Sequence, residues 1–211
     1  MTILAPKERL AVVPTGSEPM TVAEFLAWDG FDHGHRYQLI DGTIVMMTPT
    51  LGNHNVLVSA LSRELGVALK GTRFRVFVLG GVARSRKADR WFEADVMVTA
   101  EPGNLRFYSE PLLVAEVLSP STEDLDRRIK LPDYRRLPSV GEILLLDQFR
   151  PYVEVHRRPT QVGGEWTVAL LTDLGDTLEL VSLPLRLPLS DLYEGVTFGP
   201  PPADEWGGAD T

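Results

Sequence analysis

The sequence predicts an α/β domain, with a mixed sheet of the α+β kind, flanking helices and extra antiparallel strands. Apolar runs of strand length alternate with segments in which apolar residues recur at helical spacing. One run, residues 112–118, is almost continuously apolar, which is typical of a strand buried on both faces. The 211 residues, 44% hydrophobic and 24% charged, suit a single domain with a sizeable core.

The N-terminal half is expected to contain a short helix, a hairpin and a long helix. Thr21 followed by Glu24 forms a capping-box pattern, so the first helix should start at Thr21. Segment 36–47 predicts a hairpin that turns at Asp41-Gly42, because this dipeptide tolerates the positive φ angles of a tight turn. Apolar residues at helical spacing predict the long helix over 53–70.

The remaining elements are mostly strands. Ser121 or Thr122 should cap a helix, and Pro132 should kink or restart it near Leu131. A last helical turn is expected at 189–193. The strands of one sheet are predicted at 74–79, 81–84, 94–99, 112–118, 142–147, 152–156, 166–171 and 177–181.

The composition suggests how the chain is organised and where it works. We expect an N-terminal extension over 1–20, one domain over 21–198 and a disordered tail over 199–211, which is rich in proline, glycine and acids. The absence of cysteine excludes disulfides and thiolate metal sites. No apolar run has the length of a membrane span, and the first residues lack signal-peptide features, so we expect a cytoplasmic protein without a membrane partner.

Two carboxylates lie within apolar runs, Asp95 in residues 92–98 and Glu116 in residues 112–118. A lone acid in a strand more often forms a structural ion pair, but a buried charge needs compensation. Two acids on neighbouring strands, with Lys130 just downstream, are a pattern that can bind Mg²⁺ or Mn²⁺ and act on a phosphodiester. We expect both carboxylates to converge on one cleft, where their mutual repulsion raises the pKa of at least one.

A set of motifs extends from about Thr21 to about Leu192. In order along the chain it reads Tyr37-Gln38-Leu39-Ile40-Asp41-Gly42, His54, Ala94-Asp95-Val96, Glu116-Val117-Leu118-Ser119-Pro120-Ser121-Thr122, Asp126, Lys130, Tyr134 and Leu146-Asp147. This order resembles the Uma-two (DUF820) endonuclease family, a branch of the PD-(D/E)XK restriction-endonuclease-like superfamily. The run from Glu116 to Lys130 is its most specific part.

The resemblance implies a restriction-endonuclease-like core and assigns roles to individual residues. Asp95 corresponds to the metal-binding Asp, Glu116 to the acid of the Glu-x-Lys element, and the carbonyl of Val117 to a further metal ligand. Leu118 stands where the lysine of that element is usual, so Lys130 is expected to reach the same site from the following helix. Replacing Lys130 by Ala should lower cleavage and leave folding nearly unchanged.

Three further residues are expected to support the site. Members of the family typically carry Glu at the position of Gln38, whose amide oxygen can still serve the outer shell of a metal but brings no charge. His54 either hydrogen-bonds near the site or has a purely structural role. Asp126, four residues before Lys130, lies on the same helical face and forms either part of the site or a surface salt bridge.

The net charge of −8 argues against avid, non-specific binding to nucleic acid. Local charge can still differ from the net charge, and any basic group can also be an ordinary solvated surface. The third of the three basic groups flanks Lys130, so we expect Arg127, Arg128 and Arg135 to contact phosphates. The groups are Lys70, Arg73 and Arg75; Arg84, Arg86, Lys87 and Arg90; and Arg127, Arg128, Lys130, Arg135 and Arg136.

The sequence therefore predicts a metal-dependent nuclease that hydrolyses phosphodiester bonds, with DNA as the expected partner. Lys130 would orient or deprotonate the attacking water. Because cutting both strands of a duplex calls for two active sites, a homodimer is expected. Two alternatives stay open: a nuclease-fold protein that binds nucleic acid or regulates without turnover, and an acidic interaction protein whose carboxylates are structural.

Overall fold

The computed structural model describes residues 11–13, 18–31, 34–161 and 164–200 of the chain. Within these residues the largest sheet has six strands in the order β4-β5-β6-β7-β8-β9. Strands β6 and β7 are parallel and the other neighbours are antiparallel, so the predicted mixed α/β class is confirmed. The strands are β4 (Arg75–Val82), β5 (Phe92–Thr99), β6 (Pro111–Leu118), β7 (Glu142–Asp147), β8 (Val153–Arg157) and β9 (Thr167–Leu171).

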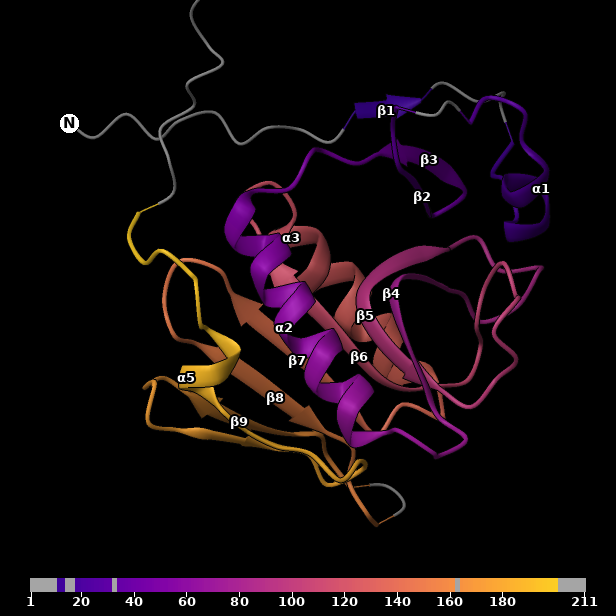
Figure 1. The fold of residues 1–211 in the computed structure, drawn as a ribbon. Coiled ribbons are helices and arrows are strands. Elements are labelled where there is room, and N and C mark those ends of the chain that lie inside the picture. Colours follow the sequence, from indigo (N-terminus) through magenta and orange to yellow (C-terminus); the bar gives the residue numbers. More distant parts are fainter. Residues whose placement is uncertain (1–10, 14–17, 32–33, 162–163, 201–211) are drawn as a thin grey trace, which may run out of the picture.

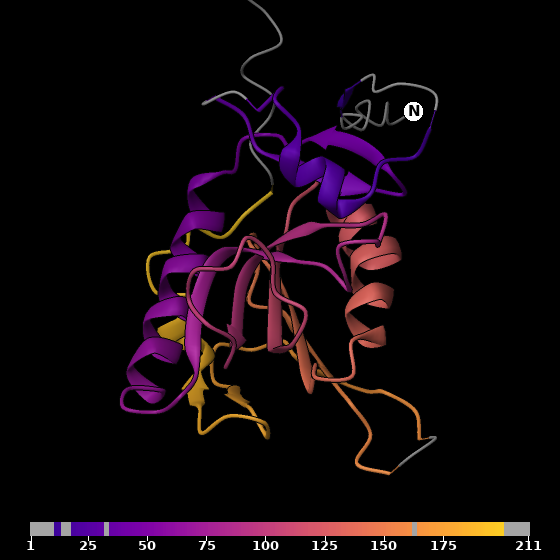
Figure 2. The same cartoon turned by 90° about the vertical axis from the view of Figure 1, so that its right-hand side faces the viewer.

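Helices cover both faces of this sheet (Figures 1 and 2). Helix α2 (Gly52–Ala68) packs on one face through a buried stripe that includes Leu57, Leu61 and Leu65. A continuous helical segment covers the other face, and it consists of α3 (Glu123–Leu125), η1 (Asp126–Lys130) and α4 (Leu131–Arg136). The apolar strands between these helices are therefore buried on both sides, as the sequence of β6 predicted.

A smaller sheet lies at one end of the large one, together with helix α1 (Val22–Ala27) (Figure 1). It contains β1 (Ala11–Val13), β2 (Tyr37–Ile40) and β3 (Thr43–Met46) in the order β1-β3-β2. The predicted hairpin is present, with Asp41 and Gly42 at φ angles of 49° and 74°. The capping box at Thr21 is also present. Of the predicted N-terminal extension and disordered tail, residues 1–10, 14–17 and 201–211 lie outside the described residues.

Two strand predictions were wrong. Residues 74–79 and 81–84 do not form two strands, because β4 continues through the glycine pair and its register is the same on both sides, Val78 with Val96 and Gly80 with Ala94. Between them, Leu79 has a φ of 54°. Segment 177–181 does not join the large sheet: β10 (Thr177–Glu179) pairs with β11 (Arg186–Pro188) in a separate two-stranded sheet, followed by α5 (Leu189–Leu192).

The helical segment changes its winding near Pro132, as predicted. In η1 the amide of Leu131 donates to the carbonyl of Asp126, a π-type bond that spans five residues. A proline has no amide hydrogen and its ring collides with the carbonyl four residues earlier, so a wider turn accommodates Pro132. The predicted side-chain cap is not formed. Thr122 is at the N-cap position, but its hydroxyl donates to Asp126 Oδ2 at 2.9 Å instead.

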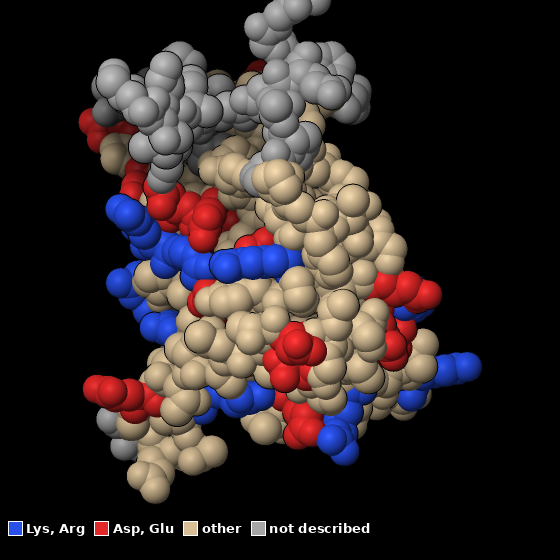
Figure 3. All heavy atoms as spheres, turned by 90° about the vertical axis from the view of Figure 1, so that its left-hand side faces the viewer, with Lys and Arg blue, Asp and Glu red and all other residues tan. Residues whose placement is uncertain are grey.

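Charges of both signs are mixed on the face shown in Figure 3, where lysine and arginine side chains lie beside aspartate and glutamate. In the helical segment, Arg127 is ion-paired with Glu123 at 2.8 Å and with Glu154 at 2.7 Å. Within the described ranges, none of the helices combines the length and the apolar character needed to cross a membrane.

Candidate active site

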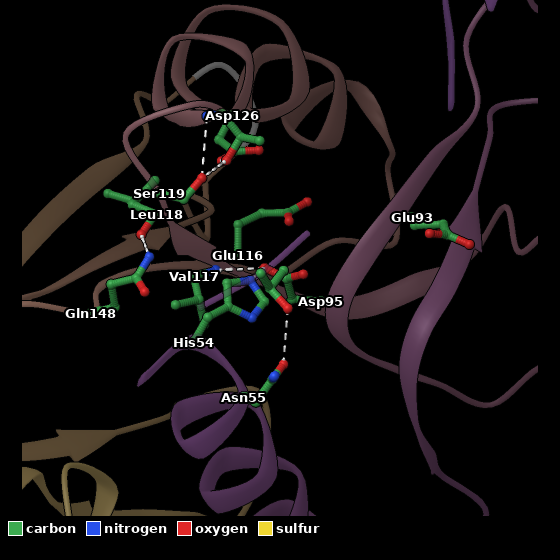
Figure 4. Close-up of polar contacts among 12 residues, drawn as sticks. His54, Asn55, Glu93, Asp95, Glu116, Val117, Leu118, Ser119, Asp126 and Gln148 are labelled. Atoms are coloured by element: carbon green, nitrogen blue, oxygen red, sulfur yellow. Dashed lines mark hydrogen bonds and ion pairs between the residues drawn. The ribbon is translucent and has the colours of Figure 1, made fainter. Parts of the chain in front are cut away.

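The two predicted acids meet where strands β5 and β6 separate. Their pairing runs through Met97 with Val114 and Val96 with Ala115, so Asp95 and Glu116 come next on the two strands. Both line one small cavity of about 30 Å³, and Figure 4 shows them close together beside Val117. The expected convergence of the two carboxylates is therefore present.

Asp95 is held by one of its two oxygens. Its Oδ2 accepts the backbone N–H of Val117 at 2.8 Å and lies 3.1 Å from Nε2 of His54, whereas Oδ1 has no hydrogen-bond partner among the described residues. Burial raises the pKa of Asp95, but His54, the charge of Lys130 and the Val117 amide together hold it below its ordinary value. Because N–H and C=O of an extended residue point to the same side, the Val117 carbonyl also faces this region.

Glu116 is only 1% exposed, and both of its oxygens have partners. The hydroxyl of Tyr134 donates to Oε1 at 2.6 Å, and Nζ of Lys130 donates to Oε2 at 3.2 Å. Burial raises the pKa of Glu116 to about 8, against the opposing effect of Lys130. A raised pKa at one of the acids was predicted, but its main cause is burial, and repulsion from Asp95 is a smaller contribution.

Lys130 reaches the site from the π turn, as expected. It is 3% exposed, and its Nζ lies 3.2 Å from Glu116, 3.1 Å from Asp126 and 3.5 Å from the carbonyl of Glu93. Burial alone would lower the pKa of Lys130, but Asp126, Glu116 and Asp95 outweigh it and raise the pKa above its ordinary value. Replacing a buried, doubly paired ammonium leaves buried acids uncompensated, so the expectation that folding would be nearly unaffected has to be abandoned.

Gln38 and His54 each carry a buried polar atom that has no hydrogen-bond partner among the described residues. Gln38, on β2, is buried and lines the cavity, and its Oε1 accepts no hydrogen bond from the described residues. His54 lies in the first turn of α2, and its Nδ1 is likewise buried without a partner. An orphaned buried acceptor is costly, so both positions are open to a ligand or a water.

Three residues at the site were not predicted. Tyr134 holds Glu116, Glu93 lines the cavity, and Arg36 lies 3.7 Å from Glu93 at the cavity wall. The sequence contained a signal for two of them: Tyr134 is four residues after Lys130, hence on the same helical face, and Glu93 is two residues before Asp95, hence on the same side of a strand. Burial raises the pKa of Glu93, and the charges of Arg36 and Lys130 oppose this effect.

The three arginines expected to contact phosphate do not line the cavity. Arg127 is tied to two carboxylates, and Arg135 donates to Nδ1 of His156 at 2.8 Å and lies over the ring of Trp166. Arg128 is different, because its side chain is 79% exposed and lies 3.6 Å from Asp124. Their role in binding phosphate stays a prediction.

The donors present fit a hard divalent cation in their chemistry. Acidic side chains outnumber permanent cations in the cavity lining: Glu93, Asp95, Glu116 and Asp126 against Arg36 and Lys130. Such ions prefer carboxylate, amide and carbonyl oxygens. Asp95 Oδ1 and Gln38 Oε1 are available, whereas the Glu116 oxygens are held by protein donors. In their present orientations no three His, Asp or Glu side chains of the described segments are arranged to hold a metal together.

Comparison with known proteins identifies the family. The model of the Uma2 family, described as "Putative restriction endonuclease", matches residues 22–190, which is most of the chain. This chain belongs to the Uma2 family. The match confirms the resemblance that the motifs between Tyr37 and Asp147 suggested.

Several other proteins are similar to this chain over most of its length. An uncharacterized Synechocystis protein, sll1609, is 33% identical over 168 residues, covering 76% of this chain and 91% of its own. A second one, slr1290, is 28% identical over 178 residues, covering 83% and 92%. The crystal structure of a putative nuclease belonging to DUF820 from Anabaena variabilis superposes with a TM-score of 0.69, at 19% identity, over 85% of this chain and 100% of that one. That structure supports the fold alone.

Proposed function

We propose that this Uma2-family protein is a metal-dependent nuclease that hydrolyses phosphodiester bonds, with DNA as the expected substrate. The observation that carries the proposal is the buried cavity in which Asp95, Glu116 and Lys130 meet and acidic side chains outnumber cations. Buried acids in excess of buried cations are unfavourable unless a ligand compensates them. The family description supports nucleic acid as the substrate class.

In this proposal Asp95, Glu116 and the Val117 carbonyl would hold Mg²⁺ or Mn²⁺, with Gln38 in the outer shell. Bound there, the ion would supply a water of lowered pKa and neutralise charge on the phosphate. Because burial raises the pKa of Glu116 to about 8, metal binding at neutral pH is expected to release a proton.

The remaining polar residues position these groups. His54 fixes the Asp95 carboxylate, and Asp126 fixes the ammonium of Lys130. The raised pKa of Lys130 keeps it protonated at neutral pH, so it would orient the water and neutralise the phosphate and would not accept a proton. Of the two roles that the sequence left open for Lys130, positioning is therefore the one proposed.

Metal binding and cleavage should be measured on the same preparations. We expect calorimetry in buffers of different ionisation enthalpy to show Mn²⁺ binding with proton release, and plasmid or single-stranded DNA to be cut when Mg²⁺ or Mn²⁺ is added. Glu116→Gln should abolish both. Glu154→Gln, a change at another buried acid, on β8, should abolish neither. Absence of metal binding, or equal cutting by the parent and Glu116→Gln, would contradict the proposal.

A second candidate is a non-catalytic protein that binds or regulates nucleic acid. It is favoured by the lack, within the described segments, of three acidic or histidine side chains arranged around a common point, and by the uncharged Gln38. Binding of DNA without cutting, under every metal condition tested, would select this function. An acidic interaction protein would show neither binding nor cutting.

A homodimer is also part of the proposal, because two active sites allow both strands of a duplex to be cut. Light scattering coupled to size exclusion measures the mass in solution directly. A monomer at every concentration, together with double-strand cutting in single encounters, would contradict this part alone.

A further inference from the structure

A second basic group lies beside the site, and three of its four members have no ion pair with a described residue: Arg84, Arg86 and Lys87. The loop between β4 and β5, residues 83–91, faces helix α4 across a cleft of about 530 Å³. Four cations and two carboxylates line this cleft: Arg84, Lys87, Arg90 and Arg136 with Asp89 and Asp133. In a chain whose net charge is −8, such a local excess of positive charge is unusual.

Three cations of this loop differ from most of those of the helical segment, because they have no ion-pair partner among the described residues. Arg84, Arg86 and Lys87 are exposed, and none of them forms an ion pair with another described residue. Arg127 and Arg136, by contrast, are each paired with a carboxylate. The loop cations are therefore the ones available to an external anion.

The backbone of the loop is fixed even though these side chains are free. The first amides of α1 hold it, since Val22 donates to the carbonyl of Ala88 at 2.8 Å and Ala23 to that of Arg86 at 3.0 Å. The hairpin turn adds a third bond, from the amide of Gly42 to the carbonyl of Asp89 at 2.8 Å. Cations on a fixed backbone can bind an extended anion without first ordering the loop.

Arg90 and Arg136 have a different task in the same cleft. Arg90 bridges Asp41, at 2.6 Å, and Asp133, at 2.9 Å, and so ties the hairpin to α4. Arg136 is paired with the same oxygen of Asp133. These residues fix the width of the cleft, and Arg84 and Lys87 supply its uncompensated charge.

The cleft and the catalytic cavity share two structural segments. Phe92, at the start of β5, lines the cleft, and the next residue, Glu93, lines the cavity. Tyr134 lines the cleft as well, while its hydroxyl donates to Glu116. A chain lying in the cleft would therefore lie against the segments that carry the site.

We propose that this cleft binds the phosphodiester backbone of a nucleic acid next to the bond that is cut. The inference rests on the proposed function, because that function names the polymer. It moves the main phosphate contact from Arg127, Arg128 and Arg135 to Arg84 and Lys87. Since cations contact phosphates and not base edges, the contact should be independent of sequence.

The test measures binding separately from cleavage. A labelled duplex is titrated, without metal, onto Glu116→Gln protein and onto the same protein with Arg84→Ala and Lys87→Ala. We expect weaker binding and a decrease of about two in the slope of log K against log salt, since each phosphate contact contributes about 0.9. The matched control is Lys70→Ala with Arg73→Ala, two exposed cations at the far end of α2, which should bind like the parent.

The outcomes separate this inference from the proposed function. If the parent binds and the Arg84/Lys87 variant has lost the affinity and the slope, the inference holds even when no protein cuts. If the Arg84/Lys87 variant binds like the Glu116→Gln protein, or if the control loses as much affinity, the inference is overturned. Metal binding and cutting by the unsubstituted protein would still support the proposed function. A parent that binds no nucleic acid overturns the inference as well. Unchanged melting temperatures show that the exposed substitutions leave the fold intact.

Discussion

The two sides of the helical segment 123–136 differ in how fully their buried acids are compensated by donors and cations. On the side facing β8, Glu154 receives hydrogen bonds from His156 at 3.2 Å, Arg127 at 2.7 Å and Tyr152 at 3.1 Å. These donors, His156 first, lower the pKa of Glu154 to about 2. Glu154 is therefore ionised, and both of its carboxylate oxygens have donors.

On the side facing the cavity, the acids outnumber the cations. Lys130 serves Glu116 and Asp126 at once, and the pKa of Glu116 rises to about 8 because burial dominates. Both arrangements contain an arginine or lysine four residues from an acid, so spacing alone does not distinguish them. A buried acid with enough donors stabilises a fold, whereas buried acids that outnumber the nearby cations indicate a place for a ligand.

The largest effect is expected from Lys130→Met. Without the ammonium, Glu116 and Asp126 lose their common partner, and breaking a buried pair costs about 3–5 kcal/mol of unfolding free energy. Cleavage should fall by about 10²–10³, the usual scale for one preorganised charged group. Urea unfolding at pH 6 and pH 9 and plasmid nicking measure the two effects. The double variant with Glu116→Gln should regain stability but not activity. If it regains neither, Lys130 acts through other contacts.

The next effect is the pH dependence of Glu116→Gln. In the unfolded chain Glu116 ionises near its ordinary pKa of 4.5, and in the fold near 8. The folded protein therefore binds an extra proton between these values, so this contribution to stability is complete below pH 4.5 and is lost as the pH rises through about 8. Relative to the parent, the metal-free variant should gain stability steadily from pH 5 to about 8.5. Parallel unfolding profiles of the two proteins would mean that Glu116 titrates normally.

A smaller effect is expected from Gln38→Glu, which adds an acid to the side already in excess. Metal affinity should rise by about tenfold, the lower end of the effect of outer-shell groups. Without metal the same variant should unfold at lower urea concentration, because another buried carboxylate lacks a partner. Calorimetry measures the expected rise in metal affinity, and urea unfolding measures the expected loss of stability without metal. A variant more stable than the parent without metal would show that the cavity is not short of positive charge.

The smallest effect is expected from Arg127→Met, on the side of the helical segment that faces β8. Because the Arg127 side chain is 32% exposed, its pairs are screened by solvent and should contribute about 0–1 kcal/mol. Metal binding and nicking should remain at the level of the parent. Loss of nicking at unchanged stability would restore Arg127 to the substrate-binding surface, as the sequence suggested.

Much of the fold followed from local patterns, because those patterns have local causes. The capping box at Thr21, the turn at Asp41-Gly42 and the apolar run of β6 each determine structure within a few residues. The pairing of 177–179 with 186–188 depends on contacts between distant segments, which periodicity does not encode.

The candidate site likewise has features that the local sequence indicates and features that depend on contacts between distant segments. The sequence indicated Asp95, Glu116 and Lys130, because acids in apolar strands are exceptional. It could not indicate which arginines already have partners, because Glu154 follows Arg127 by 27 positions and meets it only through the packing of the helix on β8. The free cations of the loop were visible as a group but could not be distinguished from the paired ones.

The left-handed residue in β4 has a consequence for solubility. Strand β4 is an edge of the large sheet, and it exposes half of the Val78 side chain. A long, regular and apolar edge is a template on which another chain can add a strand and start aggregation. Leu79, at a φ of 54°, interrupts the regular alternation of amides and carbonyls in the middle of that edge. This interruption makes the edge a poorer template for an added strand.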